Sequence, residues 1–188
     1  MSKIVIVFHS GYGHTAKIAQ AVAEGSGGAL LAIDAEGNLP DGGWEQLAAA
    51  DTIVMGSPTY MGGPSWQFKK VADASSKVWF KMGWKDKLAA GFTNSGTLNG
   101  DKFSTLQYMF TLSQQHGMLW TGMGLQAPNA KKNTRDDVNH LGGYAASSRP
   151  RRPMPRPTRW CPATSPPPRP SASAWPRSPR DLQSKRHQ

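Results

Sequence analysis

The sequence predicts a three-layer α/β fold in which helices cover both faces of a parallel β-sheet. Apolar runs typical of buried strands alternate five times with helix-like segments, and only the last helix is missing from the series. Glycine- and hydroxyl-rich loops follow three of these strands. Strand and helix that alternate in this way form parallel sheets with right-handed crossovers.

The N-terminal part holds the first two predicted strands and the first two helices. Lys3–Phe8 is a continuous run rich in β-branched residues, as expected of a strand that is covered on both faces. Apolar residues then recur with helical spacing over Ala16–Glu24, and Gly25–Gly28 end that helix. Ala29–Ile33 is a second apolar run, and Trp44–Ala50 is predicted to be a short helix.

The following part holds three further strands. Thr52–Gly56 and Leu88–Thr93 are apolar runs, each followed by a polar loop and a helix-like segment. Pro64 suits the first turn of the helix predicted over Pro64–Ala74. The second helix is predicted over Asp101–Gln114, and the last strand over Gly117–Gly122.

The loop after the first strand has the character of a phosphate cradle. Gly11 and Gly13 allow a sharp bend, and the hydroxyls of Ser10 and Thr15 lie beside the amide groups at a helix N-terminus. Such an arrangement suits a dianion. An ordinary tight turn between strand and helix is the alternative explanation of this loop.

The three polar loops follow the first, third and fourth strands at their carboxyl ends. In an open parallel sheet with strand order 2-1-3-4-5, the flavodoxin-like order, these ends meet at the switch point where flavin mononucleotide (FMN) binds. The sequence therefore predicts a flavodoxin-like, five-stranded three-layer sandwich with a flavin site at this edge.

These motifs resemble the WrbA family of flavodoxin-like NAD(P)H:quinone oxidoreductases. The resemblance runs from Lys3 to Tyr144, and each motif alone is weak, but their order and spacing are specific. They are Ser-Gly-Tyr-Gly-His-Thr (10–15), Gly-Ser-Pro-Thr-Tyr-Met-Gly (56–62), Trp79, Thr-Asn-Ser-Gly-Thr (93–97) and His-Gly-Met (116–118).

The resemblance implies a role for each matching residue. The FMN phosphate would be wrapped by Ser10, Gly11, Tyr12, Gly13, His14 and Thr15. One edge of the isoalloxazine would be lined by Pro58, Thr59, Tyr60, Met61 and Gly62, and the other by Thr93, Asn94, Ser95, Gly96, Thr97 and Gly100. His116 would lie near the flavin and is the candidate catalytic proton donor; the alternative is a hydrogen-bonded histidine before a strand that only fixes a loop. Tyr12 and Trp79 would flank the substrate, although Trp79 also suits a core or an interface.

The implied activity is transfer of two electrons from NADH or NADPH to a small-molecule quinone in a ping-pong cycle. The resemblance also implies a homo-oligomer, a dimer or tetramer, with flavin sites near subunit interfaces. Two alternatives remain open. One is a flavodoxin-type electron carrier without nicotinamide-dependent activity, and the other is a protein that binds a partner through its C-terminal tail.

The charge balance divides the chain at Tyr144. Residues 1–144 carry 12 Lys+Arg and 11 Asp+Glu, whereas residues 145–188 carry 10 basic residues and one acid. The first part is interpreted as the FMN-binding domain and the second as an irregular tail rich in Pro, Arg and Ser, in place of the final helix. The near-neutral domain gives no reason to expect nucleic acid as a partner.

Three explanations of the tail are considered. It is a polyproline ligand, a basic arm for nucleic acid, or the product of a reading-frame shift in a GC-rich gene. The abrupt change in composition where the final helix belongs favours the third.

Cys161 is the only cysteine, so a reducing compartment, the cytoplasm, is expected. No membrane span and no metal site are expected.

Overall fold

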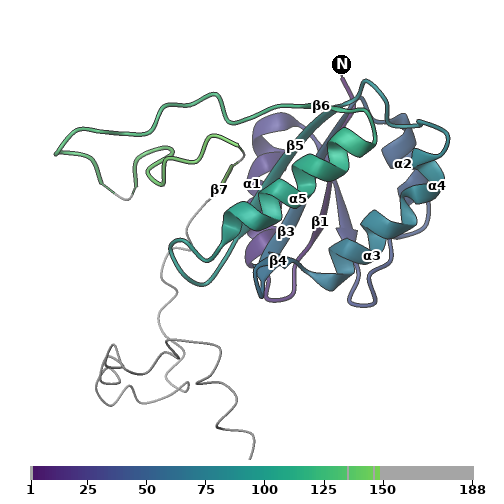
Figure 1. Cartoon of the computed structure of the whole chain (residues 1–188), viewed down its shortest axis with the longest axis horizontal. Helices are drawn as coiled ribbons and strands as arrows, with labels where there is room; N and C mark the ends of the chain where they lie inside the picture. The colour runs from purple at the N-terminus through teal and green to yellow at the C-terminus, as the bar shows by residue number, and fades with distance from the viewer. Residues whose placement is uncertain (1, 135, 146, 149–188) are drawn as a thin grey trace, which may run out of the picture. The chain divides into compact units, whose positions relative to one another are not determined.

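The computed structural model describes residues 2–134, 136–145 and 147–148. Its central feature is a parallel sheet with helices on both faces (Figure 1). The main path of the sheet is β2-β1-β3-β5-β6. Because β5 and β6 are the fourth and fifth predicted strands, the predicted order 2-1-3-4-5 is confirmed. These strands are β1 (Ile4–His9), β2 (Ala29–Ile33), β3 (Thr52–Tyr60), β5 (Leu88–Asn94) and β6 (Leu119–Trp120).

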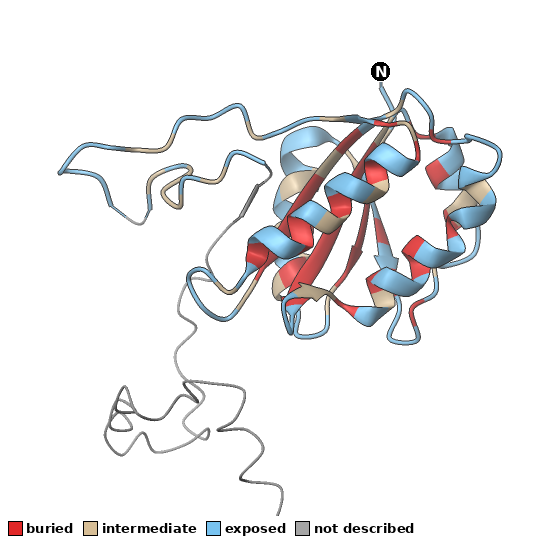
Figure 2. Cartoon of the chain, viewed as in Figure 1, coloured by how far each residue is buried: buried red, intermediate tan, exposed pale blue. Residues whose placement is uncertain are grey.

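Two hydrophobic clusters lie on opposite faces of the sheet. Helix α1 (His14–Ser26) packs against Ile6, Phe8 and Phe92 on one face. The cluster on the other face takes buried side chains from α2 (Gly43–Ala49), α3 (Trp66–Ala74) and α5 (Lys102–Gln115). Figure 2 shows the buried residues concentrated on the strands and on the helix surfaces that face them. The four predicted helices are therefore present. A short fifth one, α4 (Ser76–Trp79), was not predicted.

The structure corrects the sequence-based boundary after the third strand. β3 does not end at Gly56 but continues to Tyr60, and β4 (Gly63–Pro64) folds back to pair antiparallel with it. Met61 and Gly62 form the turn with positive φ angles of 48° and 78°. Pro64 is consequently a strand residue rather than the first residue of a helix. Ser65 instead precedes α3 and caps it, since its hydroxyl accepts from the Phe68 amide at 3.4 Å.

The edge of the sheet where the last strand is predicted holds two short strands from different parts of the chain. β6 contains two residues instead of the six predicted over Gly117–Gly122, and β7 (Ser147–Ser148) pairs in parallel with Phe92 and Thr93. One edge of β5 pairs with β3 along the whole length of β5, so β6 and β7 share the other edge of β5. The sheet thus reaches beyond the predicted domain boundary at Tyr144. The rest of the predicted tail, from residue 149 on, lies outside the described residues.

The face of the sheet that carries α1 is incompletely covered. In the described part of the chain α1 is the only helix packed on this face. Leu88 and Leu119 are register partners on neighbouring strands, and they are 45% and 57% exposed. The sequence predicts that the final helix, which would cover such a face, is missing, but this prediction falls on residues from 149 on and lies outside the described residues. None of the described helices is long and apolar enough to cross a membrane.

Candidate functional site

A cavity of about 320 Å³ opens at the carboxyl edge of the sheet. Its walls come from the loop after β1 and the start of α1, from the last residues of β3, and from the end of β5 with the loop that follows it. These are the three segments that the sequence predicts to meet at this edge, although the residues from β3 belong to the strand and not to a loop. All of its lining residues belong to the predicted cofactor-binding set: Tyr12, His14, Thr15, Pro58, Thr59, Tyr60, Asn94, Ser95 and Gly96. No Asp or Glu is among them, so the cavity suits a neutral or negatively charged ligand.

The loop before α1 leaves room for such a ligand. Gly13 precedes the helix in the left-handed conformation, with φ 80°, and a Cβ atom there would meet no other atom within 4 Å. The first amide groups of a helix have no acceptor within the helix, and its N-terminus carries partial positive charge. Ser10 stabilises the turn, because its hydroxyl accepts from the Ala16 amide at 3.1 Å. The geometry therefore fits the predicted anion cradle.

A buried hydrogen bond joins this cradle to β5. The Thr15 hydroxyl donates to Asn94 Oδ1 at 2.8 Å, and both side chains are buried. Among the described residues no acceptor is found for Asn94 Nδ2. Its two protons are therefore available for an acceptor in the cavity, such as a ligand hydroxyl or phosphate oxygen.

Threonine hydroxyls fix the wall between β3, β5 and α5. Thr59 Oγ1 lies 2.8 Å from Oγ1 of Thr93 and 2.8 Å from Oγ1 of Thr105. A hydroxyl has one proton, so Thr59 accepts from at least one of these two partners. Thr93 does not line the cavity itself but contacts Thr59, which does. Sequence reasoning did not find Thr105, which has no distinguishing pattern within a helix.

Two tyrosines form the mouth of the cavity. Tyr12 is 79% exposed, and its ring meets that of Tyr60 edge to face, with centroids 6.1 Å apart. Burial, and to a smaller extent Tyr12, raises the pKa of the Tyr60 hydroxyl above its ordinary value. Gly11 lies so close to Tyr60 that a Cβ atom would come within 2.7 Å of its hydroxyl. The tyrosine pair presents aromatic surface suited to a flat ligand.

The loop after β5 is held by a lysine that sequence reasoning missed. Lys102 Nζ donates to Ser95 Oγ at 3.0 Å and to the Thr97, Leu98 and Asn99 carbonyls at 3.3, 2.5 and 2.8 Å. Its side chain is buried, and burial lowers the pKa of its ammonium group. A lysine at the first position of a helix interacts unfavourably with the helix dipole. This unfavourable placement is the one feature of the sequence that could have drawn attention to Lys102.

His116 does not line this cavity. It follows the last residue of α5, and the chain next enters β6, where Leu119 pairs with Leu88 at the beginning of β5. The cavity lies at the other end of β5, where Asn94 lines it. Within one chain, the prediction that His116 contacts the flavin as a proton donor is therefore not supported, because α5 carries it to the opposite edge of the sheet.

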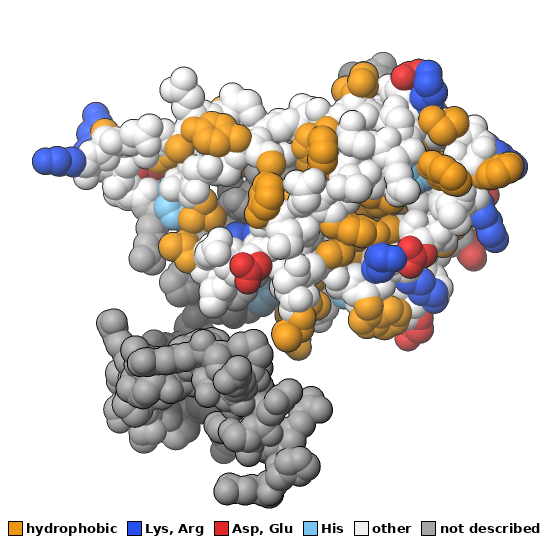
Figure 3. Space-filling view, viewed as in Figure 1, with side chains coloured by type: hydrophobic (Ala, Val, Ile, Leu, Met, Phe, Trp, Pro, Cys, Tyr) orange, Lys and Arg blue, Asp and Glu red, His pale blue; other side chains and the backbone are white. Residues whose placement is uncertain are grey.

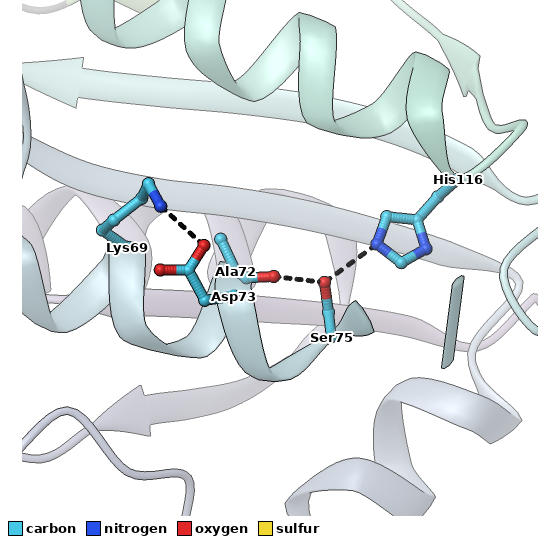
Figure 4. Close-up of polar contacts among 5 residues, drawn as sticks. All are labelled: Lys69, Ala72, Asp73, Ser75 and His116. Carbon is cyan, nitrogen blue, oxygen red and sulfur yellow. Dashed lines mark hydrogen bonds and ion pairs between the residues drawn. The ribbon is translucent and has the colours of Figure 1, made fainter. Parts of the chain in front are cut away.

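The surroundings of His116 are those of a structural histidine (Figure 4). The Ser75 hydroxyl uses its only proton to donate to the Ala72 carbonyl at 2.6 Å, so it accepts from His116 Nε2 at 2.9 Å. His116 also packs against Trp84, with ring centroids 4.3 Å apart. Its Nδ1 atom finds no partner among the described residues, and burial lowers the pKa of the imidazole.

The other predicted residues fall into two groups. Gly62 and Met61 form the turn after β3, where Met61 is fully exposed. Gly100 and Thr97 belong to the loop held by Lys102. Trp79 is separate from both groups, because it ends α4, one turn after the Ser75 that contacts His116. In the described part of the chain, no group of three or more His, Cys, Asp or Glu side chains could hold a metal ion.

Comparison with known proteins connects this geometry to a protein family. Residues 44–131 match the family model described as NADPH-dependent FMN reductase. Flavodoxin FldP of Pseudomonas aeruginosa is 52% identical over 142 residues, which cover 76% of this chain and 77% of that protein. An NAD(P)H dehydrogenase (quinone) of Geobacter metallireducens is 32% identical over 170 residues, covering 78% and 83%.

A solved structure also resembles this chain in sequence and in fold. The flavodoxin, WrbA-like protein from Agrobacterium tumefaciens is 64% identical to the matched part, with a TM-score of 0.63. The match covers 64% of this chain and 77% of that one.

Proposed function

Because the chain belongs to the WrbA-like family of flavodoxin-fold proteins that bind FMN, we propose that it is an NAD(P)H:quinone oxidoreductase. The observation that carries the proposal is the cavity at the carboxyl edge of the sheet, which is lined by residues at and just after the carboxyl ends of β1, β3 and β5. When bound, FMN supplies the redox chemistry: it takes two electrons from NADH or NADPH and gives them to a quinone.

The chain's own residues would bind and orient this cofactor. The amide groups around Gly13 would hold the phosphate, since a Cβ-free, left-handed residue at a helix start leaves room for it. Thr15 would fix Asn94, so that the free Nδ2 donors of Asn94 reach a polar group of the ligand. The isoalloxazine would lie between the turn at Met61 and the loop that begins at Ser95.

The substrate would stack at the mouth of the cavity. Tyr12 is largely exposed and rests edge to face on Tyr60, so its ring is free to cover a flat nicotinamide or quinone. Since one such face accommodates one flat molecule at a time, the donor would leave before the quinone binds. This order corresponds to a ping-pong cycle.

We also propose that the active form is a homo-oligomer. Trp79 and Phe80 are 45% and 83% exposed although both are large and apolar. Figure 3 shows hydrophobic side chains on the face of the molecule that carries α3, α4 and α5. Trp79 does not line the cavity of its own chain, so a role beside the flavin would require a second copy. Light scattering on the wild type and on Trp79→Ala, with the flavin absorption spectrum of both, tests this proposal.

A flavodoxin-type electron carrier is the second candidate. It is favoured by the 52% identity to a protein named flavodoxin. A carrier would bind FMN but would not be reduced by nicotinamide nucleotides, whereas the proposed enzyme would be reduced by them.

A visible absorption spectrum distinguishes the two candidates. The full chain is incubated with FMN and desalted, then mixed without oxygen with NADH or NADPH and finally with benzoquinone. For the proposed enzyme we expect bound flavin that bleaches with the nucleotide and recovers with the quinone. Bound flavin that neither nucleotide bleaches would favour the carrier, and the absence of bound flavin would contradict both.

A further inference from the structure

Lys102 is a buried cation without a carboxylate partner among the described residues. Its side chain is 5% exposed, and neither of the described ion pairs involves it. Buried lysines are normally paired with an acid, because a charge removed from water is costly unless it is compensated. The compensation here comes only from neutral oxygen atoms.

Those oxygen atoms belong to the segment between the cavity and α5. Three are the carbonyls of Thr97, Leu98 and Asn99, and the fourth is the Ser95 hydroxyl. The same hydroxyl donates to the Thr97 carbonyl at 2.9 Å, which closes the loop on itself. Ser95 also lines the cavity, so the ammonium group is one hydrogen bond away from a cavity residue.

The charge of Lys102 is reinforced by its place in the fold. It is the first residue of α5, a helix of 14 residues, and the helix N-terminus adds partial positive charge at the same point. No Asp or Glu lines the cavity, so nothing in its lining cancels this potential. A negative charge that develops in the cavity near Ser95 would therefore be stabilised.

Resting on the proposed function, we propose that Lys102 is a positioning residue that tunes the bound FMN. It fixes the loop over residues 95–99 and holds a positive charge beside the flavin. FMN gains electrons when it is reduced, and a nearby charge is one of the means by which a protein tunes its electronics. Lys102 thus raises the affinity of the chain for reduced FMN more than its affinity for oxidised FMN.

The test compares variants of the full chain that separate charge from loop support. Lys102→Met removes the charge and the hydrogen bonds, Lys102→Gln keeps donors for the loop carbonyls, and Lys102→Arg keeps the charge. Lys87→Met is the matched control. The Lys87 ammonium also donates to backbone carbonyls, those of Ala48 and Ala50, but it precedes β5 at the edge of the sheet opposite the cavity.

Two quantities are measured for each variant: the dissociation constant of oxidised FMN, from fluorescence quenching, and the midpoint potential of the bound FMN, from anaerobic equilibration with a reference dye. For Lys102→Met and Lys102→Gln we expect the affinity for reduced FMN to fall about tenfold more than that for oxidised FMN. For a two-electron couple, this ratio lowers the midpoint potential by about 30 mV. Lys102→Arg and Lys87→Met should stay near the wild-type potential.

The outcomes separate this inference from the proposed function. If Lys102→Gln and Lys102→Met lose affinity for both forms of FMN equally, or shift no more than Lys87→Met, Lys102 only supports the loop and the inference is wrong. If Lys102→Met does not fold, Lys102→Gln gives the decision. Failure of the wild-type chain to bind any FMN would overturn the proposed function and this inference with it.

Discussion

The Thr15 hydroxyl donates a 2.8 Å hydrogen bond to Asn94 Oδ1, which ties the start of α1 to the carboxyl end of β5. The two residues are 79 positions apart in the chain. They come together because β1 and β5 both pair with β3 and run in the same direction. The bond therefore couples the loop proposed to hold the phosphate to the loop proposed to hold the flavin ring.

Replacing Thr15 by valine should weaken both the fold and FMN binding. Valine has nearly the same shape, but it leaves Asn94 Oδ1 buried without its donor, which costs about 1–3 kcal/mol. We expect the free energy of unfolding in urea to fall by that amount and FMN to bind at least about tenfold more weakly. Thr111→Val is the control, because the Thr111 hydroxyl donates only to the Gln107 carbonyl on an exposed helix surface. Equal losses in both variants would contradict this role for Thr15.

Gly100 should tolerate no side chain. Its φ is +52°, and a Cβ atom would lie 2.1 Å from Ser95 Oγ and 2.9 Å from Thr97 Oγ1. Gly100→Ala must therefore open the loop that Lys102 holds, and we expect a loss of about 1–3 kcal/mol in the stability of the FMN-free protein. Gly96→Ala serves as the control in the same loop, because a Cβ atom there meets nothing within 4 Å. The melting temperatures of both variants are measured by thermal unfolding without FMN. The same melting temperature for both would contradict the prediction that Gly100 tolerates no side chain.

The strand order and the cavity could be predicted because they depend on local signals. The apolar runs mark the strands, and the polar loops after β1, β3 and β5 must meet at one edge of a parallel sheet. All of the residues that line the cavity were consequently among the predicted ones. What the sequence did not indicate was pairing between segments. The extension of β3 to Tyr60 depends on its pairing with Gly63, and apolar periodicity carries no sign of such a pairing.

The misplaced residues have a similar physical reason. A motif gives the order of His116 along the chain but not its position in space, and the length of α5 carries it to the far edge of the sheet. Lys102 gave only a weak sequence signal, a lysine that opposes the helix dipole at the first position of α5. Its function as a loop anchor depends on carbonyl groups, which every residue has. Sites built from backbone atoms are therefore the ones that residue types do not reveal.

Replacing Tyr12 by alanine should impair turnover but not folding. The Tyr12 side chain is 79% exposed, so its removal should change the free energy of unfolding by no more than about 0.5 kcal/mol. If its ring covers the substrate, kcat/KM for benzoquinone should fall about tenfold, since aromatic contacts of this kind contribute roughly 0.5–1.5 kcal/mol beyond the buried area. Tyr12→Phe should retain most of the activity. Unchanged steady-state kinetics in Tyr12→Ala would remove Tyr12 from the substrate site.

Acidification should destabilise the fold through its buried histidines. Burial holds the pKa of His116 and of His9 below the ordinary value of 6.5. Below about pH 6.5 the unfolded chain therefore binds more protons than the folded one, so stability that is fully present above this pH is lost as the pH falls. Each histidine contributes a slope of at most about 1.4 kcal/mol per pH unit. We expect urea unfolding to show this loss between pH 7.5 and 5.5.

His116→Asn identifies the share of that slope that belongs to His116. Asparagine retains a donor for the Ser75 hydroxyl but does not titrate, so the variant should be less stable at pH 7.5 and lose less stability on acidification. If the free energy of unfolding falls equally in wild type and variant between pH 7.5 and 5.5, His116 does not contribute to the pH dependence.

The exposed leucines on the α1 face should limit solubility rather than stability. Leu119 and Leu88 lie side by side and are 57% and 45% exposed, on a face where the described residues provide no helix besides α1. Contiguous apolar surface of this kind promotes association, whereas a lysine on a short edge strand opposes it. We expect Leu119→Lys to stay monodisperse at several-fold higher concentration, as measured by light scattering, with a free energy of unfolding within about 0.5 kcal/mol of wild type.

Leu98→Lys is the control, since Leu98 is 55% exposed but lies in the loop after β5. An equal gain in solubility from Leu98→Lys would indicate a general effect of charge, and no gain from Leu119→Lys would mean that this face is already covered.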